Sequence, residues 1–273
     1  MTTPTYSDDF TSDGWTDADS SYIGVNTGNE NFDIKSNNTD GSNDASAWDN
    51  GSTINDTKWI VDFDWNFTSW SGNNRGSVFI GFSNTDEGVG RTGTQDFLGC
   101  IFDNGTGKIS SSDQDNGNNP LKDTTGSTLS TGTTYYMRMI RLSSTTYKVD
   151  RYSNSARTTL TESVSGTCTA TVDSLRYFKV MNQMEAGGGG ASVSTINNFK
   201  FWNGINEFVD EQQVKVWFYP DNNVQNIIDE QQVKVWFYPD NNVQTKDQQV
   251  KVWFYPDNNV NPPETAWKWW LGM

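Results

Sequence analysis

The sequence predicts an all-β protein: an antiparallel β-sandwich followed by a C-terminal segment of β repeats. Two observations carry this prediction. Short stretches alternate apolar and polar residues with a period of two, and clusters of Gly, Ser, Thr, Asn and Asp separate them, as turns separate strands. Aromatic residues reach 14% and include 12 Trp, so aromatic side chains are expected to supply much of the core. A chain of 273 residues has room for one large β domain and an appendage.

The clearest strand is KWIVDFDWNF at residues 58–67. Its alternation predicts one buried aromatic face and one solvated face that carries Asp62 and Asp64. The apolar face is made of Trp59, Val61, Phe63, Trp65 and Phe67.

Further strands are predicted along residues 6–205. They are SVFIGFS at 77–83, with Val78, Ile80 and Phe82 on one side, DFLGCIFD at 96–103, the pair at 133–143 and 145–153, LRYFKVMNQ at 175–183 and STINNFKFWNG at 194–204. The polar stretches at 36–56 and 110–128 are expected to be surface loops, and Gly187 to Gly190 a hairpin loop. No amphipathic helix is predicted, and the spacing of the strands favours a sandwich or jelly roll.

Composition excludes several classes of function. Lys and Arg number 19 against 34 Asp and Glu, and the net charge of −15 argues against binding nucleic acid or an anionic membrane surface. The absence of His removes the commonest general base and metal ligand. Cys100 and Cys168 are too few for a zinc site, and a single disulfide or two buried thiols both remain open. No apolar run is long enough for membrane insertion, and the start shows no signal-peptide pattern.

The ordered series DDFTSDGW, TKWIVDFDWNF, VFIGFS, QDFLGCIF, STGTTYYMRMIR, LRYFKVMNQ and INNFKFWNG resembles laminin-G-like, concanavalin A-like lectin jelly rolls over about residues 6–205. The resemblance implies two curved antiparallel sheets that bind glycans or proteins at the loop rim or on the concave sheet. Such modules occur on cell-surface proteins and on virions. The expected domains are residues 1–205 for the jelly roll, 206–260 for three tandem repeats and 261–273 for a Pro/Trp-rich tail.

The same fold hosts glycoside hydrolases, which need two carboxylates flanking the scissile bond. In the jelly-roll hydrolases these carboxylates come from a Glu-x-Asp-x-x-Glu strand. This sequence contains no such spacing, because Glu30, Glu87, Glu162 and Glu185 stand apart from one another. The protein is therefore expected not to be an enzyme.

Lectin-like binding remains open, because it needs an aromatic ring to stack on a sugar and Asn or Asp to bind its hydroxyls. The candidate ligand-binding residues are Trp48, Asp49, Trp70, Asn73, Asn74, Asp103 and Asn104. Calcium, which takes oxygen ligands, is the one cofactor considered, at Asp86, Glu87 and Asp103. The alternative is that all of these are ordinary turn residues.

The phrase QQVKVWFYPDNNV occurs three times, starting at Gln212, Gln231 and Gln248. Each copy reads as a strand ended by Pro and a turn. Exposed copies would aggregate, so they are predicted to be covered within the chain, between chains or on a partner. Three Trp in the tail are expected in the same interface. The predicted assembly residues are Val214, Val216, Trp217, Phe218, Tyr219, Val233, Val235, Trp236, Phe237, Tyr238, Val250, Val252, Trp253, Phe254, Tyr255, Trp267, Trp269 and Trp270.

Together these features favour a non-enzymatic virion surface protein, such as a decoration, tail fibre or spike component, with an outward-facing glycan-binding jelly roll. Its partners would be other copies of itself, a particle protein and surface glycans. The alternatives are an extracellular adhesin or filament subunit and an isolated carbohydrate-binding module. The expected location is the virion surface or the extracellular space.

Overall fold

A computed structural model describes residues 3–17, 22–35, 45–70, 76–86, 95–103, 105–117, 121–184 and 192–208. The chain divides into two units, Met1–Asp210 and Glu211–Met273, and all described residues belong to the first. Among them every regular element is a β-strand, as the sequence predicts. The described part of the chain holds no helix of the length and apolarity that crossing a membrane requires.

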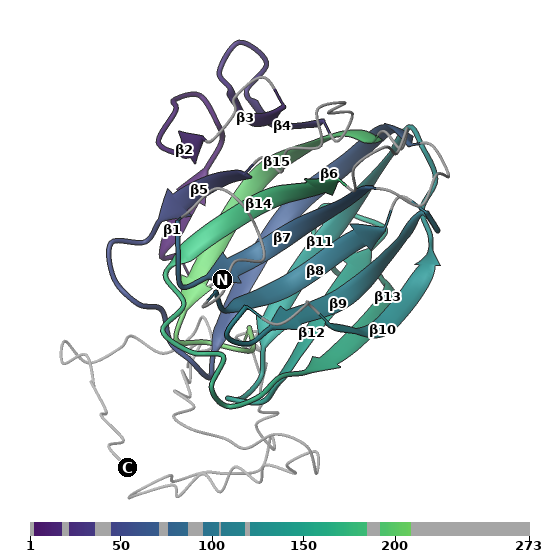
Figure 1. Cartoon of the computed structure of the whole chain (residues 1–273). Helices are drawn as coiled ribbons and strands as arrows, with labels where there is room; N and C mark the ends of the chain where they lie inside the picture. Colours follow the sequence, from purple (N-terminus) through teal and green to yellow (C-terminus); the bar gives the residue numbers. More distant parts are fainter. Residues whose placement is uncertain are drawn as a thin grey trace, which may run out of the picture. The chain divides into compact units, whose positions relative to one another are not determined.

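The strands form two antiparallel sheets that pack face to face as a sandwich of the jelly-roll class (Figure 1). The eight-stranded sheet runs in the order β13 (Leu160–Thr167), β12 (Thr146–Tyr152), β11 (Thr133–Arg141), β6 (Trp59–Trp70), β15 (Ser192–Asn203), β4 (Asn31–Lys35) and β3 (Ile23–Asn26), with β1 (Tyr6–Asp8) paired to β15. The seven-stranded sheet runs β10 (Leu121–Thr128), β9 (Lys108–Gln114), β8 (Phe97–Asp103), β7 (Gly76–Ser83), β14 (Tyr177–Met184), β5 (Ala45–Asp49) and β2 (Thr16–Asp17).

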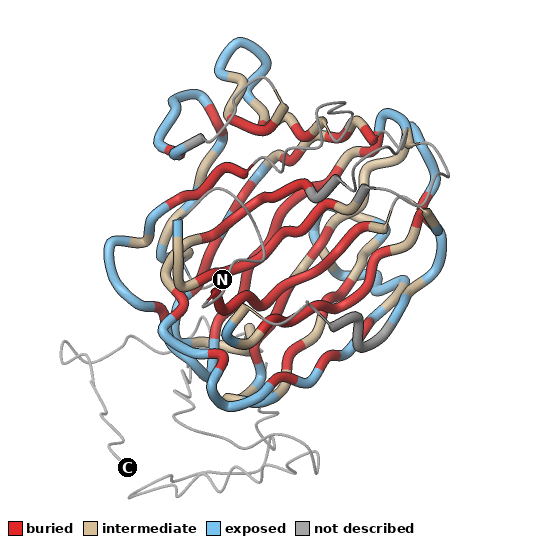
Figure 2. The backbone as a smooth tube through the Cα atoms, viewed as in Figure 1, coloured by how far each residue is buried: buried red, intermediate tan, exposed pale blue. Residues whose placement is uncertain are grey.

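The core lies between the two sheets, where the apolar face predicted for β6 is fully buried (Figure 2). Trp65 and Phe67 of β6 meet Phe102 of β8, with ring centroids 6.1 and 4.5 Å apart. Trp59 meets Phe82 of β7 at 5.1 Å. Aromatic pairs across the sandwich therefore join the sheets, and the prediction of an aromatic core is confirmed.

Two stretches expected to be surface loops contain strands. The stretch 36–56 holds β5, and the stretch 110–128 holds β10 and most of β9. Both stretches are rich in Ser, Asn and Asp, which sequence analysis assigns to turns. In the sheet, however, their backbones pair with the apolar strands β14 and β8.

Cys100 and Cys168 are both free and buried, which resolves the open question of a disulfide between them. Burial raises the pKa of the Cys100 thiol far above its ordinary value.

After β15 the chain turns back onto the outer face of the eight-stranded sheet. There Ile205 and Phe208 pack on a cluster of Ile60, Ile140 and Trp202. The rings of Trp202 and Phe208 lie 4.8 Å apart, nearly at right angles. The predicted repeats and tail at 206–273 lie outside the described residues, apart from 206–208.

Candidate functional site

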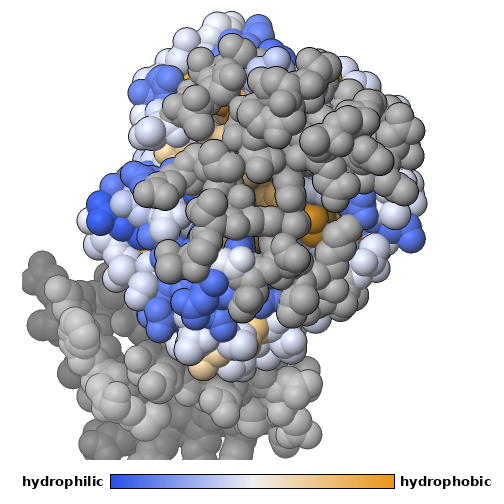
Figure 3. Space-filling view, viewed as in Figure 1, coloured by the Kyte–Doolittle hydropathy of each residue, from blue (hydrophilic) through white to orange (hydrophobic). Residues whose placement is uncertain are grey.

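The outer face of the seven-stranded sheet carries a second apolar cluster, separate from the main core. Its members alternate along their strands with residues that point into the core, and they are Ala45, Phe79, Phe97, Ile101 and Met181. All five are buried, although they lie on the side of the sheet that faces away from the sandwich interior. Figure 3 views the molecule from this side and shows hydrophobic surface near the middle of the view.

Two glycines make room within this face. Gly81 of β7 and Gly99 of β8 lie directly opposite each other. A Cβ on Gly99 would lie 2.1 Å from the carbonyl oxygen of Ile80, so the strands approach more closely than side chains allow. Phe79 and Phe97 belong to the rows on either side of this pair, and their rings meet at 6.0 Å. The absence of two side chains thus permits an aromatic contact across the glycine row.

Polar side chains continue the outer face on β9. Ile109, Ser111 and Asp113 pair with core-facing residues of β8, so Ser110, Ser112 and Gln114 point outward. We name these three residues the β9 strip. All three are almost fully buried. Ser110 Oγ donates to Thr125 Oγ1 of β10 at 3.0 Å.

The other two members of the β9 strip lack hydrogen-bond partners. Within the described residues, neither Ser112 Oγ nor Gln114 Nε2 is paired. A buried polar group without a partner costs about 1–3 kcal/mol of stability. Such groups are rare in native proteins and call for an explanation, of which an absent bound molecule is one.

The neighbours of the β9 strip have complementary chemistry. By register Gln114 lies beside Phe97, Ser112 beside Gly99 and Ser110 beside Ile101. A hydroxyl and an amide therefore border an apolar, partly aromatic surface. This combination suits a ligand that has both an apolar face and hydroxyl groups.

Asp96 fixes the strand ends next to Gln114. Its carboxylate accepts the Asn116 N–H at 2.9 Å and the Asn84 side-chain amide at 3.4 Å, while its own N–H donates to Asn84 Oδ1 at 2.9 Å. These bonds connect the ends of β7, β8 and β9. Burial raises the pKa of Asp96, and the charges of Asp115 and Asp173 raise it further.

Of the predicted ligand residues Trp48 and Asp49, the structure buries the first and leaves the second at the surface in an ion pair. Trp48 is buried, and its ring stacks on Tyr6 with centroids 4.1 Å apart. Its place in the core corrects the expectation that it offers a face to a ligand. Asp49 binds Arg176 through two bonds of 2.7 Å each, and this pair is exposed.

Trp70 and Asp103, also predicted to bind ligand, come together at the opposite end of the sheet. The Trp70 ring lies so close to Gly107 that a Cβ on that glycine would be 2.4 Å from the ring. Asp103 accepts the Gly105 N–H at 2.9 Å and so stabilises the turn after β8. The local contacts are those of a packed turn. Asn73, Asn74 and Asn104 lie outside the described residues.

The calcium site predicted at Asp86, Glu87 and Asp103 does not form as one cluster. Asp103 pairs with Ser77 at one end of β7, whereas Asp86 follows Ser83 at the other end. The six residue steps from Ser77 to Ser83 span roughly 20 Å. Glu87 is outside the described residues, and within them no group of three acidic or sulfur ligands could hold a metal ion.

Asp62 and Asp64 are not solvated, contrary to the prediction, but buried and ion-paired. Arg138 binds Asp62 through bonds of 2.7 and 2.8 Å. Arg157 lies 3.4 Å from Asp62 and donates to Asp64 at 2.6 Å. Asn198 donates to the second oxygen of Asp64 at 2.7 Å. Two carboxylates held in this way are neutralised by cations, which disfavours their use as a general acid and base.

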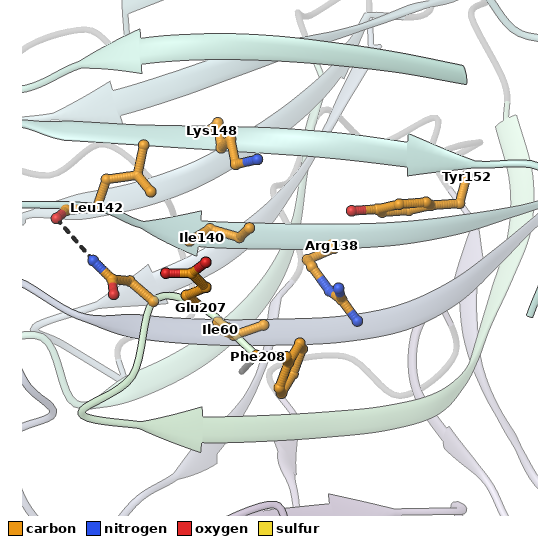
Figure 4. A pocket seen from close by; sticks show the side chains of 9 residues that line it. Ile60, Arg138, Ile140, Leu142, Lys148, Tyr152, Glu207 and Phe208 are labelled. Carbon is orange, nitrogen blue, oxygen red and sulfur yellow. Dashed lines mark hydrogen bonds between the residues drawn. The ribbon is translucent and has the colours of Figure 1, made fainter. Parts of the chain in front are cut away.

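A separate pocket of about 390 Å³ lies on the outer face of the eight-stranded sheet (Figure 4). The Arg138 guanidinium lies 4.5 Å from the Phe208 ring and 5.5 Å from that of Tyr152. Lys148 at the rim binds Asp150 at 2.7 Å. The two cations of this pocket are thus already engaged, Arg138 by Asp62 and Lys148 by Asp150. Its lining residues are Ile60, Arg138, Ile140, Leu142, Lys148, Tyr152, Asn206, Glu207 and Phe208.

Sequence reasoning missed the β9 strip because KISSSDQ is polar on both faces. One signal was present. The DNGTG turn at 103–107 follows an apolar strand, and an Asn-Gly turn of this kind predicts a hairpin and hence a returning strand. The predicted assembly residues between Val214 and Trp270 all lie outside the described residues.

No family model matches the chain, and neither does any curated protein. Solved structures with similar folds include the Emp47p carbohydrate recognition domain, with 15% identity, a TM-score of 0.49 and coverage of 73% of this chain and 96% of that one. The CBM2 module of the Lactobacillus casei BL23 phage J-1 evolved Dit has 10% identity, a TM-score of 0.48 and coverage of 76% and 98%. The family 7 alginate lyase A1-II' has 10% identity, a TM-score of 0.44 and coverage of 68% and 85%. At these sequence identities and TM-scores, the similarity identifies no functional residue in this chain.

Proposed function

We propose that this protein is a non-enzymatic glycan-binding module whose ligand contacts the β9 strip. The observation that carries the proposal is the pair of buried, unpartnered polar groups, Ser112 Oγ and Gln114 Nε2. Sugar hydroxyls both donate and accept hydrogen bonds, so one glycan can pair with a hydroxyl and with an amide.

The surroundings of the strip support a glycan over a charged ligand. Phe97 and Ile101, which are both buried, place apolar side chains next to Gln114 and Ser110. Sugars present an apolar ring face together with their hydroxyls, and aromatic rings are well suited to contact that face. The laminin-G-like, concanavalin A-like resemblance of residues 6–205 agrees with a role in binding.

A non-catalytic role is part of the proposal. Asp62 and Asp64, which share one face of β6, are engaged by Arg138 and Arg157. The sequence contains no His. Glu162 forms an ion pair with Arg151 at 3.1 Å. We infer that the site binds its ligand without transforming it.

Assembly through the C-terminal repeats on a virion or extracellular surface is a second part of the proposal, supported by the sequence of the repeats. Phe208, the last described residue, packs on the outer face of the eight-stranded sheet. The β9 strip lies on the outer face of the other sheet. Phe208 and the β9 strip thus lie on opposite outer faces of the sandwich.

Two neighbouring serines give a matched test. Ser112 points outward without a partner, whereas Ser111 points inward and donates to the Ser165 carbonyl at 2.9 Å. On an array of neutral and acidic oligosaccharides, the full chain should bind a defined subset. Ser112→Ala should lose that binding, and Ser111→Ala should retain it. Equal binding by all three proteins, or binding by none, would contradict the proposal.

A further inference from the structure

Two polar side chains in the main core lie side by side without full hydrogen bonding. Trp59 begins β6 and Arg141 ends β11, and the two residues are direct partners in the register of the sheet. Both point into the sandwich and are fully buried. Side chains of directly opposed strand residues lie about 5 Å apart at Cβ, so these two line the same end of the core.

Backbone carbonyls hold the Arg141 guanidinium in a fixed position. Its Nε donates to the Ser143 carbonyl at 3.1 Å, and its Nη2 donates to the carbonyls of Ser144 and Val172 at 2.9 and 2.8 Å. These bonds use three of the five N–H donors of the guanidinium. Within the described residues, Nη1 and its two hydrogens have no partner.

The charge of Arg141 is not balanced at short range. Carbonyl oxygens carry no net charge, and among the described residues no carboxylate lies within ion-pair distance of this arginine. Burial lowers the pKa of Arg141, and interaction with Cys168, Asp56 and Asp173 offsets part of that effect. A buried, uncompensated ion costs several kcal/mol, so a compensating charge would be strongly favoured.

The Trp59 indole, on the residue directly opposite Arg141 in the sheet register, provides a second free donor. Trp59 Nε1 is buried and unpaired in the described part of the structure. By contrast, Trp65 Nε1 donates to Ser194 Oγ at 3.0 Å and Trp15 Nε1 to Asp8 at 2.9 Å. Indole and guanidinium N–H groups donate but never accept. A water molecule could accept from both groups but carries no charge, whereas an anion accepts from both groups and also neutralises Arg141.

We propose that Arg141 Nη1 and Trp59 Nε1 bind a monovalent inorganic anion of halide size at this end of the core. The bound anion would join β6 and β11 to the segment around Val172, which closes the same end of the sandwich. This site is independent of the proposed glycan site, because it lies inside the sandwich and not on its outer face.

Thermal unfolding of the full chain tests the proposal. Sodium chloride is compared with sodium gluconate at constant ionic strength, since gluconate is too large to enter the core. Chloride should raise the melting temperature by roughly 2–4 °C, because a ligand that binds only the folded state stabilises it. In crystals soaked in bromide, an anomalous peak should lie within hydrogen-bond distance of Arg141 Nη1.

Trp59→Phe removes the indole donor and should abolish most of the difference between the two salts. Trp65→Phe is the matched control, because it removes a buried indole that already has a partner, and it should keep that difference. Trp59→Phe avoids Arg141, whose loss would also release three carbonyls. Equal melting temperatures in both salts, an absent bromide peak, or the same loss of salt dependence in both variants would overturn the proposal.

Discussion

Arg157 binds two buried carboxylates at once, and its removal would leave both undercompensated. Its side chain is 7% exposed, and those of Asp62 and Asp64 are 5% and 10% exposed. We expect Arg157→Ala to lower the free energy of unfolding by roughly 3 kcal/mol, because breaking a buried ion pair leaves an unpaired charge behind. Chemical denaturation at neutral pH measures this change.

The control is Arg176, whose bidentate pair with Asp49 has similar distances but lies at the surface. The side chains of Arg176 and Asp49 are 38% and 45% exposed. Exposed pairs contribute about 0–1 kcal/mol, so Arg176→Ala should have a much smaller effect. Similar losses in the two variants would show that burial of the Arg157 pairs contributes nothing.

Asp96 should make stability fall with rising pH. Its folded-state pKa lies above the ordinary value of 3.8, so the folded protein holds this proton more tightly than the unfolded chain. The cost of ionising Asp96 is absent below pH 3.8 and complete above its folded-state pKa. The stability of Asp96→Asn relative to the parent protein should therefore be greater in neutral buffer than in acidic buffer. A constant difference at both pH values, measured by denaturation, would contradict this assignment.

For single residues, the sequence predicted which side chains of β6 face the core. It did not predict the environment of the acidic residues on the opposite face. The alternation placed Asp62 and Asp64 correctly on the face away from the core. They contact Arg138, Arg157 and Asn198, which lie 76 or more positions further along the chain. A local pattern carries no information about such partners.

The opposed glycines of β7 and β8 determine how closely those strands approach. Gly99→Ala would place a Cβ 2.1 Å from a backbone carbonyl, and backbone cannot move aside as a side chain can. We expect a loss of roughly 3 kcal/mol or more in the free energy of unfolding. Gly14→Ala is the control, because a Cβ there meets nothing within 4 Å. Equal stability of the two variants in thermal unfolding would contradict the close approach.

Strands were predictable where one face is apolar and difficult where neither is. β6, β7, β11 and β12 follow period-two patterns or apolar runs, and all appear in the structure. β9 has Ile109 as its single apolar residue, and the predicted loop at 110–128 covers the rest of this strand after Ile109, which carries the candidate site. The polar residues that suit a strand for ligand binding also remove the pattern by which it would be recognised.

On the scale of the whole molecule, the described chain ends in contact with the sandwich rather than at β15. Ile205 and Phe208 cover Ile60, Ile140 and Trp202, and Phe208 also lies against Arg138. A domain cut at Gly204 would expose this cluster. A cut after Asp210 would retain it and still remove all three repeats.

We expect the protein truncated after Asp210 to stay folded and to bind glycan but to lose self-association. The protein truncated after Gly204 should melt at a lower temperature, because it exposes three large apolar side chains. Calorimetry and sedimentation measure the two properties separately. Self-association unchanged by the cut after Asp210 would contradict assembly through the repeats, and equal melting temperatures would contradict the packing of Phe208.

The most direct test of the proposed glycan site is the side-chain amide of Gln114, observed by nuclear magnetic resonance. On titration with an oligosaccharide selected by the array, the resonances of its Nε2 hydrogens should change in chemical shift. They gain a hydrogen-bond partner that the described residues do not provide. The side-chain amide of Asn182 already donates to the Lys35 carbonyl at 3.2 Å, so its resonances should keep their chemical shifts. Saturating glycan binding that leaves the Gln114 amide unmoved would contradict the account.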